Sequence, residues 1–344
     1  MRSHWGINDN MIDKETDKIL VFDIGGTNLR SSLFDSVQDS LIKVSKIPTF
    51  NYLAKPQPTG KEIVGRLFQD IAKLSIAVLD DRLPDIVSIA FPGPVDKRGN
   101  ALSGPPIWGS LHSEPVPISQ ELSNLWPSAR VLVSNDITCA GYRYLRNSED
   151  DLCVITISSG IGLKVFIQGQ PLLGSNSMGG EAGHLKVDFT EDAPICACGV
   201  KGHLSAVASG RASVYQAQKL YSSDPLAFKS SAIASLLDGD IKKISNEVIV
   251  QAFHQKDSWT YELVKRMATP VGHLLGGIHL TTGIEYFVVV GGFALALGES
   301  YRQLLVESAN ACTWDLSADW DKSIVLGEND DYSGLIGAGC LAKK

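Results

Sequence analysis

One pattern occurs twice in this sequence: a short apolar strand, a turn of small residues and a returning strand. The first copy joins residues 19–22 to 29–35 through Gly25 and Gly26, and the second joins 152–157 to 163–167 through Gly160. Apolar runs joined by Gly-rich turns predict β-hairpins. Two such hairpins, well separated along the chain, favour an internal duplication in which two similar α/β domains face each other. Gly hairpins are common, so coincidence is the alternative.

The composition predicts a soluble globular protein that binds neither nucleic acid nor membrane. The 344 residues are 44% apolar and 20% charged, and the formal net charge is −7. No Lys/Arg cluster supplies the basic face of a nucleic-acid-binding protein. Residues 1–18 contain no apolar signal segment, and no apolar run is long enough to cross a bilayer. We therefore expect a cytoplasmic protein.

Strand and helix patterns continue along the rest of the chain. Apolar residues recur at helical spacing in 61–79, whereas 85–91 is a buried-type strand that stops at a Pro-Gly-Pro sequence. The other expected elements are strands at 41–47, 130–134 and 284–290, and helices at 119–125, within 205–283, at 293–306 and at 333–342.

The first Gly turn has the composition of an anion-binding site. Gly25 and Gly26 let the backbone approach an anion closely, and Thr27 and Asn28 add side-chain donors. Asp23, at the end of the preceding strand, is suited to hold a water of a hydrated Mg²⁺, because Mg²⁺ prefers carboxylate and water ligands. The alternative is an ordinary hairpin in which Asp23 is a turn former.

Asn135 and Asp136 follow directly after the strand at 130–134. Open α/β sheets bind their ligands beyond the carboxyl ends of their strands, so these side chains are placed to contact a ligand. The carboxylate of Asp136 is suited to accept a proton, and the Asn135 amide both donates and accepts hydrogen bonds. Taken alone, Asn-Asp at this position also predicts a turn or a helix N-cap.

These motifs, taken in order, resemble the ROK family of sugar kinases and repressors, which belongs to the actin/hexokinase/Hsp70 superfamily. The matching segments are 23–30, 91–95, 135–136, 157–162, 180–184, 196–199 with Gly202, and 288–292. The resemblance covers about residues 19–339. It implies an α/β fold with two ribonuclease-H-like (actin-like ATPase) domains and a cleft between them. We place the small N-terminal domain at 19–136 and the larger domain at 137–332, with the C-terminal helix at 333–344 packing back on the first domain.

The resemblance also implies a glucokinase-like function, the ATP-dependent phosphorylation of a primary hydroxyl of a hexose or sugar-like polyol. Asp136 would be the general base that takes the proton from the attacking hydroxyl. ATP and Mg²⁺ would bind at the first Gly turn and at a second phosphate loop made by Ser159 and Gly160. Gly291 and Gly292 would lie beside the adenosine.

The family precedent has Glu181 and His184 contacting sugar hydroxyls, together with Asn135 and Asp136. A carboxylate accepts two hydroxyl hydrogen bonds at once, which suits a vicinal diol. The alternative is that Glu181 caps a loop and that His184 is a structural histidine.

The resemblance further implies a structural Zn²⁺ bound by His184, Cys196, Cys198 and a third cysteine, but that third position holds His203 here. Zn²⁺ accepts imidazole as readily as thiolate, so a site with two His and two Cys ligands is expected. The zinc would orient His184 for substrate binding through its other ring nitrogen. The alternative is a loop without metal that carries two reduced thiols.

Two other positions depart from the family pattern. Ser205 stands where the family has the Glu that reaches the anomeric end of glucose, and serine is too short to make that contact. The substrate expectation therefore widens to another hexose, an N-acylated sugar or a cyclitol, and a C7-cyclitol kinase of aminocyclitol biosynthesis is the alternative function. Leu163 and Lys164 stand where the family prefers Gly-Gly, and we interpret Lys164 as a solvent-facing strand lysine.

A rival from another class is the non-catalytic, sugar-sensing regulator of the same family. Its DNA-binding helices need more than the short segment before residue 19. Asp23 and Asp136 are both present, which favours catalysis. An actin-like structural or chaperone ATPase would not explain the cluster formed by Glu181, His184 and Cys196. Dimers are frequent in the family, so a homodimer is possible.

Overall fold

The computed structural model describes residues 18–79, 83–314 and 318–344, and the structural statements below concern these ranges. Our expectations that the N-terminal segment carries no targeting signal and no DNA-binding helices concern residues 1–17, which lie outside the described residues. None of the helices in these ranges has both the length and the apolar character that a bilayer span requires.

The described strands form two five-stranded sheets with the same topology. In each sheet the first strand lies between an antiparallel return strand and a later parallel strand. The first sheet has the order β3-β2-β1-β4-β5, formed by β1 (Ile19–Ile24), β2 (Asn28–Asp35), β3 (Ser40–Pro48), β4 (Ile86–Phe91) and β5 (Arg130–Asn135). The second has the order β8-β7-β6-β9-β10, formed by β6 (Leu152–Ile157), β7 (Ile161–Ile167), β8 (Gln170–Pro171), β9 (Phe287–Val290) and β10 (Ile324–Leu326). The shared order is what the predicted duplication requires.

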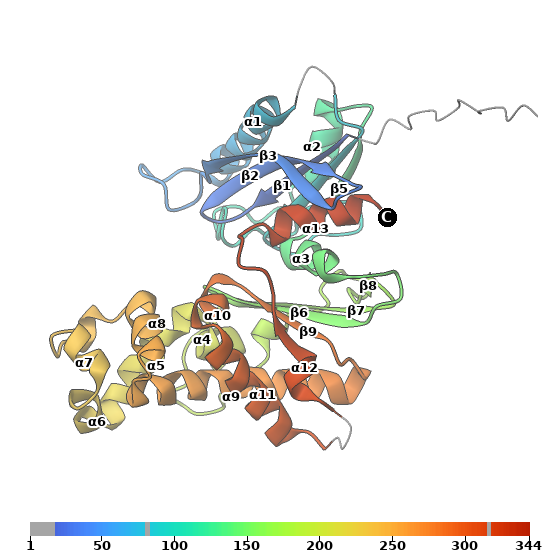
Figure 1. Cartoon of the computed structure of the whole chain (residues 1–344). Coiled ribbons are helices and arrows are strands. Elements are labelled where there is room, and N and C mark those ends of the chain that lie inside the picture. The colour runs from blue at the N-terminus through green and yellow to red at the C-terminus, as the bar shows by residue number, and fades with distance from the viewer. Residues whose placement is uncertain (1–17, 80–82, 315–317) are drawn as a thin grey trace, which may run out of the picture.

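The helices form layers around the two sheets. Helices α1 (Gly60–Val78) and α2 (Ile118–Leu125) pack on one face of the first sheet. Helices α3 (Asp136–Tyr144) and α13 (Ser333–Ala342) lie side by side between the two sheets (Figure 1). On the other side of the second sheet lie α4 (Leu204–Ala208), α5 (Gly210–Ser223), α6 (Pro225–Lys229), α7 (Ala232–Leu236), α8 (Asn246–His254), α9 (Ser258–Thr282), α10 (Gly292–Leu297), α11 (Glu299–Cys312) and α12 (Trp320–Ser323). Of these, α6, α7 and α8 extend beyond the end of the sheet (Figure 1).

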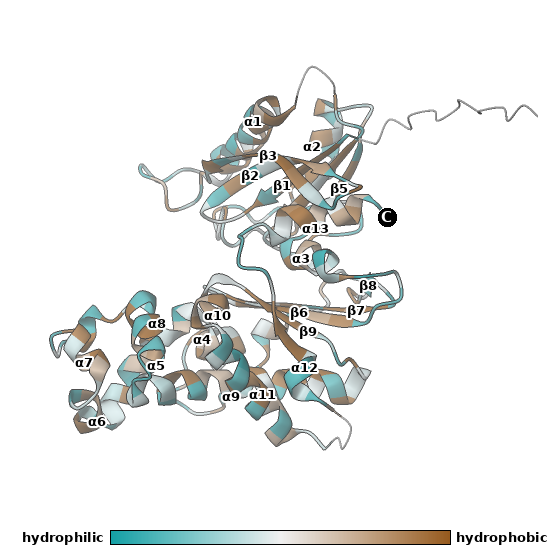
Figure 2. Cartoon of the chain, viewed as in Figure 1, coloured by the Kyte–Doolittle hydropathy of each residue, from teal (hydrophilic) through white to brown (hydrophobic). Residues whose placement is uncertain are grey.

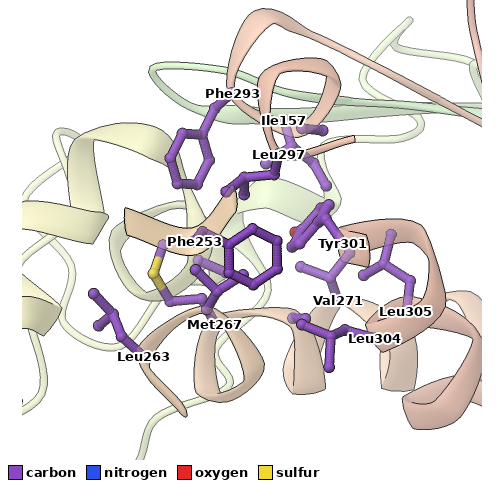
Figure 3. Close-up of a cluster of buried hydrophobic side chains, with 14 of the residues drawn as sticks. Ile157, Phe253, Leu263, Met267, Val271, Phe293, Leu297, Tyr301, Leu304 and Leu305 are labelled. Carbon is purple, nitrogen blue, oxygen red and sulfur yellow. The ribbon is translucent and has the colours of Figure 1, made fainter. Parts of the chain in front are cut away.

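The central strands of the second sheet are apolar along their length because both faces are buried (Figure 2). Residues 153, 155 and 157 of β6 face the helical layer, whereas Val154 faces α3. Figure 3 shows the core on the helical side, where Leu263, Met267 and Val271 recur every four residues along α9 and meet Tyr301 of α11. This spacing places one apolar stripe of the helix against its neighbours.

Glycines bring α3 and α13 into backbone contact. A Cβ at Gly337 of α13 would overlap the carbonyl oxygen of Cys139 in α3. On the two outer sides, a Cβ at Gly141 of α3 would overlap the ring of Phe166 in β7, and one at Gly339 of α13 would overlap Phe34 in β2. The C-terminal helix thus packs on the first sheet and on α3. The division of the chain at residue 136 stays a prediction.

Two expected elements differ from the structure. The single helix predicted at 293–306 is wrong, because Gly298 adopts φ +68° and ψ −151° and separates α10 from α11. The strand predicted at 284–290 begins only at Phe287. The ends of the other expected strands and helices agree with the structure to within two residues.

The contact between α3 and α13 can be tested by adding one methyl group. We expect Gly337→Ala to lower the free energy of unfolding by about 1–3 kcal/mol, because the new Cβ forces the two helices apart. Gly277→Ala is the matched control, since Gly277 is also helical but has open space where its Cβ would lie. That control should be neutral or stabilising by up to about 1 kcal/mol. Urea unfolding measures the free energy of unfolding of both variants. An equal gain in this free energy from the two substitutions would contradict the contact.

Candidate active site and metal centre

A cleft of about 270 Å³ lies between the two sheets and is lined from both sides. The end of β5 contributes Asn135 and Asp136, and β7 with the segment after it contributes Lys164 and Glu181. The remaining lining residues are Pro92, Gly93, Pro106, Ile137, Thr156, Ser158, Gly160, Ile161, Gly162 and Leu163. A larger hollow of about 490 Å³ at the start of α1 contains none of the predicted site residues.

Asn135 and Asp136 are held by the first turn of α3. The Asn135 Oδ1 accepts hydrogen bonds from the N–H groups of Ile137 and Thr138, at 3.0 and 3.2 Å, so Asn135 is the N-cap. Its Nδ2 donates to the carbonyl of Gly93 at 3.0 Å and to Asp136 Oδ1 at 2.9 Å. Both amide hydrogens are therefore used within the protein. In this structure Asn135 orients Asp136, and its predicted contact with a polyol stays a prediction.

The pKa of Asp136 is raised to about 7, first by burial and second by the negative charge of Asp23. The Ile137 N–H and the charge of Lys164 act in the opposite direction, whereas Glu181 adds to the increase. A carboxylate with a pKa near neutrality can accept a proton from a hydroxyl and still be largely ionised at pH 8. The pKa of Asp136 therefore suits a general base.

The first Gly turn is fixed by side chains that follow β3. Thr49 Oγ1 donates to the carbonyl of Gly25, and Asn51 Nδ2 donates to that of Gly26, both at 2.7 Å. Within the described residues the N–H groups of Gly26 and Thr27 have no protein acceptor. Gly26 also packs on the cleft residue Pro106, 2.8 Å from where its Cβ would lie. The turn therefore presents free N–H groups, as an anion-binding loop requires.

Asp23 lies beneath this turn with Arg30 at 3.2 Å. The pKa of Asp23 is raised to about 6, because the effect of burial exceeds the opposing effect of Arg30, and the charge of Asp331 adds to the increase. A buried carboxylate that has one cationic partner and a second carboxylate nearby fits a place where a hydrated cation would be bound. The role of Asp23 toward Mg²⁺ stays a prediction.

The second Gly turn lies in the wall of the cleft through Ser158 and Gly160, whereas Ser159 is exposed. Ser205 bonds to the Ile161 N–H at 3.1 Å, which anchors the end of the turn. Gly291 has φ +99°, and a Cβ there would be 2.7 Å from the backbone of Ile157 at the end of β6. The structure thus places Gly291 and the adjacent Gly292 directly beside this turn.

Our interpretation of Lys164 as a solvent-facing lysine is wrong. Its side chain is 3% exposed, and its Nζ donates to the carbonyl of Gly179 at 2.6 Å and to Glu181 Oε1 at 3.0 Å. The alternation along β7 places residues 162, 164 and 166 on the face that packs on α3. Burial of the ammonium group is tolerated because it is paired with a carboxylate and hydrogen-bonded.

Four potential metal ligands lie together outside the cleft. The ligand atoms of His184, Cys196, Cys198 and His203 are all within 4.8 Å of one another. The two Nδ1 atoms are 3.3 Å apart, and the thiols of Cys196 and Cys198 lie 3.8 and 3.2 Å from the Nδ1 atoms of His184 and His203. Tetrahedral zinc with N and S ligands has edges of roughly 3.3–3.8 Å. The donor set and its spacing therefore fit a structural zinc.

The structure brings Asn135, Asp136, Gly160 and Glu181 into one cleft, whereas His184 belongs to the cysteine cluster and does not line it. Sequence reasoning missed Thr49, Asn51 and the role of Lys164. The alternation of Gly162, Lys164 and Phe166 along one strand was a signal for a buried lysine. No local pattern indicated that Thr49 and Asn51 hold the first turn.

Residues 19–344 match the family described as the ROK family. The C(7)-cyclitol 7-kinase of Streptomyces hygroscopicus subsp. jinggangensis is 33% identical over 331 residues, which cover 94% of this chain and 93% of the relative. The N-acetylmannosamine kinase of Shigella boydii is 27% identical over 326 residues, covering 94% and 98%. The structure of a ROK family glucokinase from Streptomyces griseus in complex with glucose and AMPPNP is 24% identical. It aligns with a TM-score of 0.72 and covers 95% of this chain and 99% of that one. The fold is thus the expected α/β architecture of two actin-like domains.

The arrangement of the metal cluster predicts that His203 is needed for zinc binding. We expect purified protein to contain about one zinc per chain, held by two imidazoles and two thiolates. His203→Ala should lose most of the metal, whereas His203→Cys should keep it because a thiolate is an equivalent ligand. Elemental analysis measures the zinc content, and His273→Ala, which changes an exposed histidine of α9, is the control. Metal-free wild-type protein, or equal zinc in the His203→Ala and control variants, would remove the site.

Proposed function

This chain belongs to the ROK family, and we propose that it is an ATP-dependent kinase of a sugar-like polyol whose best-supported acceptor is a C7-cyclitol. One observation carries the proposal: Asp136, with a pKa near neutrality, lies in a cleft whose opposite wall contains the second Gly turn. Phosphoryl transfer needs in-line positioning, charge neutralisation and one carboxylate beside the nucleophilic oxygen. The carboxylate of Asp136 and the second Gly turn, which line the same cleft, support this proposal.

In the proposed reaction Asp136 accepts the proton of the attacking hydroxyl. Asn135 holds the carboxylate in position, because its Nδ2 donates to Asp136 Oδ1. The N–H of Ile137 donates to the same oxygen at 2.9 Å. The other carboxylate oxygen is left to face the acceptor, and this arrangement supports proton transfer at one defined atom.

The proposed nucleotide site uses both Gly turns. The N–H groups of Gly26 and Thr27, with Asn28, would bind phosphate oxygens from one side, and Ser159 and Gly160 would bind them from the other. Mg²⁺, when bound near Asp23, neutralises negative charge on the phosphates. Support comes from the glucokinase of the same fold, which was crystallised with the ATP analogue AMPPNP.

The acceptor class follows from the relatives and from one substitution. The chain is 33% identical to a C(7)-cyclitol 7-kinase and 27% identical to an N-acetylmannosamine kinase, over nearly the full length of each. Ser205 bonds to the backbone N–H and carbonyl of Ile161, so it serves the turn rather than a sugar. An acceptor that carries carbon in place of the ring oxygen does not need the missing Glu.

A sensing regulator of the same family would need a polyol site but no base. The raised pKa of Asp136 and the hydrogen bonds that hold the first Gly turn favour a catalytic protein. The cytoplasmic location and the homodimer expected from the sequence stay predictions.

Asp136→Asn tests the base. Asparagine can keep both bonds to its Oδ1, so we expect polyol binding to change little while kcat falls by about 10²–10⁴-fold. In the wild-type enzyme kcat/KM should fall about tenfold per pH unit below roughly pH 7, because the protonated carboxyl cannot accept a proton. The residual activity of the variant should lack this decrease at low pH, which is the acid limb of the pH profile.

Unfolding does not account for such a loss if the variant is as stable as the wild type. The folded state disfavours the charge of Asp136, so the thermal midpoint of Asp136→Asn at pH 8 should be equal or higher. Asp192→Asn, an exposed residue, is the control. Near-normal turnover of Asp136→Asn would show that the base lies elsewhere.

Acceptor choice is tested with a panel of hexoses, N-acetylhexosamines and C7-cyclitols, with the phosphorylated position identified by NMR. We expect the highest kcat/KM for a C7-cyclitol and poor use of glucose. Ser205→Glu should raise kcat/KM for glucose by about ten- to a hundred-fold, since a hydrogen bond to a charged group is worth roughly 1.5–3 kcal/mol. Ser205→Gln is the uncharged control of equal length. Equal use of glucose and cyclitol by the wild type would contradict the proposed acceptor.

A further inference from the structure

Lys164 is a charged group in the cleft that the proposed reaction does not use. It lies on β7 between Gly162 and Phe166, which both face α3. A Cβ at Gly162 would be 3.1 Å from Ile137, and Phe166 packs against Gly141. Lys164 therefore lies on the face of β7 that packs on α3, and it lines the cleft together with Asp136.

The ammonium group of Lys164 joins β7 to the segment that carries Glu181. Its bonds to the Gly179 carbonyl and to Glu181 Oε1 span both ends of a three-residue turn. Gly180, in the middle, has φ +85°, and a Cβ there would be 2.3 Å from the carbonyl oxygen of Leu163 and 2.9 Å from Lys164 Cδ. The turn therefore packs tightly on β7 at Leu163 and Lys164, and a larger residue at 180 would not fit.

Glu181 keeps one oxygen available to the cleft. Its side chain is 38% exposed, and its Oε2 has no protein partner in the described part of the chain. Lys164 uses two of its three N–H groups in the bonds to Gly179 and Glu181, so one donor remains. An acceptor and a donor therefore lie next to each other in the cleft wall, which is the pattern that two neighbouring hydroxyls require.

The charges around this pair also favour a neutral acceptor. Asp23, Asp136 and Glu181 are anionic when ionised, and Lys164 and Arg30 are the cations beside them. An acceptor carrying a phosphate or carboxylate would add negative charge to a cleft that already has an excess of it.

We propose that Lys164 is a positioning residue that determines specificity: it fixes Glu181 so that the pair binds a vicinal diol of a neutral polyol and orients the reacting hydroxyl toward Asp136. This inference rests on the proposed kinase function and adds the feature of the acceptor that is recognised. Lys164 acts through Glu181, and its charge also favours the ionised form of Asp136.

The test is Lys164→Met, which removes the charge and keeps the length of the side chain. We expect KM for the polyol to rise about ten- to a hundred-fold, because Glu181 loses its charged partner. KM for ATP should stay within about twofold, and the acid limb of kcat/KM should move to higher pH. Lys243→Met is the matched control, since Lys243 pairs with Asp238 on the surface of the same half of the chain.

Two further variants separate positioning from general destabilisation. In a Glu181→Gln background, Lys164→Met should add less than about twofold to KM for the polyol, because contacting residues are coupled. Lys164→Gln keeps hydrogen-bond donation without the charge, so it should restore part of the KM while the acid limb stays displaced. If Lys164→Met does not fold, Lys164→Gln alone decides through that displacement.

An unchanged KM for the polyol in Lys164→Met, additive effects in the double variant, or a wild-type acid limb in Lys164→Gln would each overturn the inference. A wild-type protein that phosphorylates no polyol would instead overturn the proposed function. The two failures are therefore distinguishable.

Discussion

The backbone contact between α3 and α13 is the constraint on which the rest of the site depends. Gly337 lets the two helices meet at the carbonyl of Cys139, and Gly141 lets β7 of the second sheet approach α3. Because one helix pair packs on both sheets, the position of α3 relative to each sheet is set by close packing. Asp136 is the first residue of α3. The same contacts that join the two halves of the chain therefore place the proposed base in the cleft between them.

Carboxylates gather in and beside the cleft, and among the described residues two cations pair with them. Arg30 lies beside Asp23, and Lys164 lies beside Glu181. Burial raises the pKa of Asp136 to about 7 and that of Asp23 to about 6. These values suit different tasks, since a base must exchange a proton near neutral pH, whereas a group that supports a bound cation is ionised once the cation is present. Burial is thus the main cause of the two raised pKa values, and the charged neighbours modify them.

The segment from Gly179 to His184 links the cleft to the metal cluster. Lys164 holds its first part through the Gly179 carbonyl and Glu181, and a single 3₁₀ turn, Ala182–His184, leads directly to the cluster. A zinc bound there would fix the far end of the segment that carries the proposed polyol contact. Structural metals act in this way by removing conformational freedom from a loop. With zinc bound, the cluster and Lys164 would hold the segment that carries Glu181 from opposite ends.

The sequence by itself predicted most strands and the longer helices in their order, because apolar spacing and turns at Gly or Pro act over a few residues. It did not predict α3, β8, β10 or the break at Gly298. It also predicted roles for Asp136, Glu181 and the four residues of the metal cluster, since each stands in or beside a short recognisable motif. The hydrogen-bond partners of Lys164 and the anchoring of Gly25 by Thr49 were decided only by the tertiary structure. Each of these depends on a partner whose position is set by packing between elements far apart in the chain, and no local pattern encodes that distance. The physical reason is that hydrogen-bond partners are selected by where the backbone carries them, after the sheets and helices have packed.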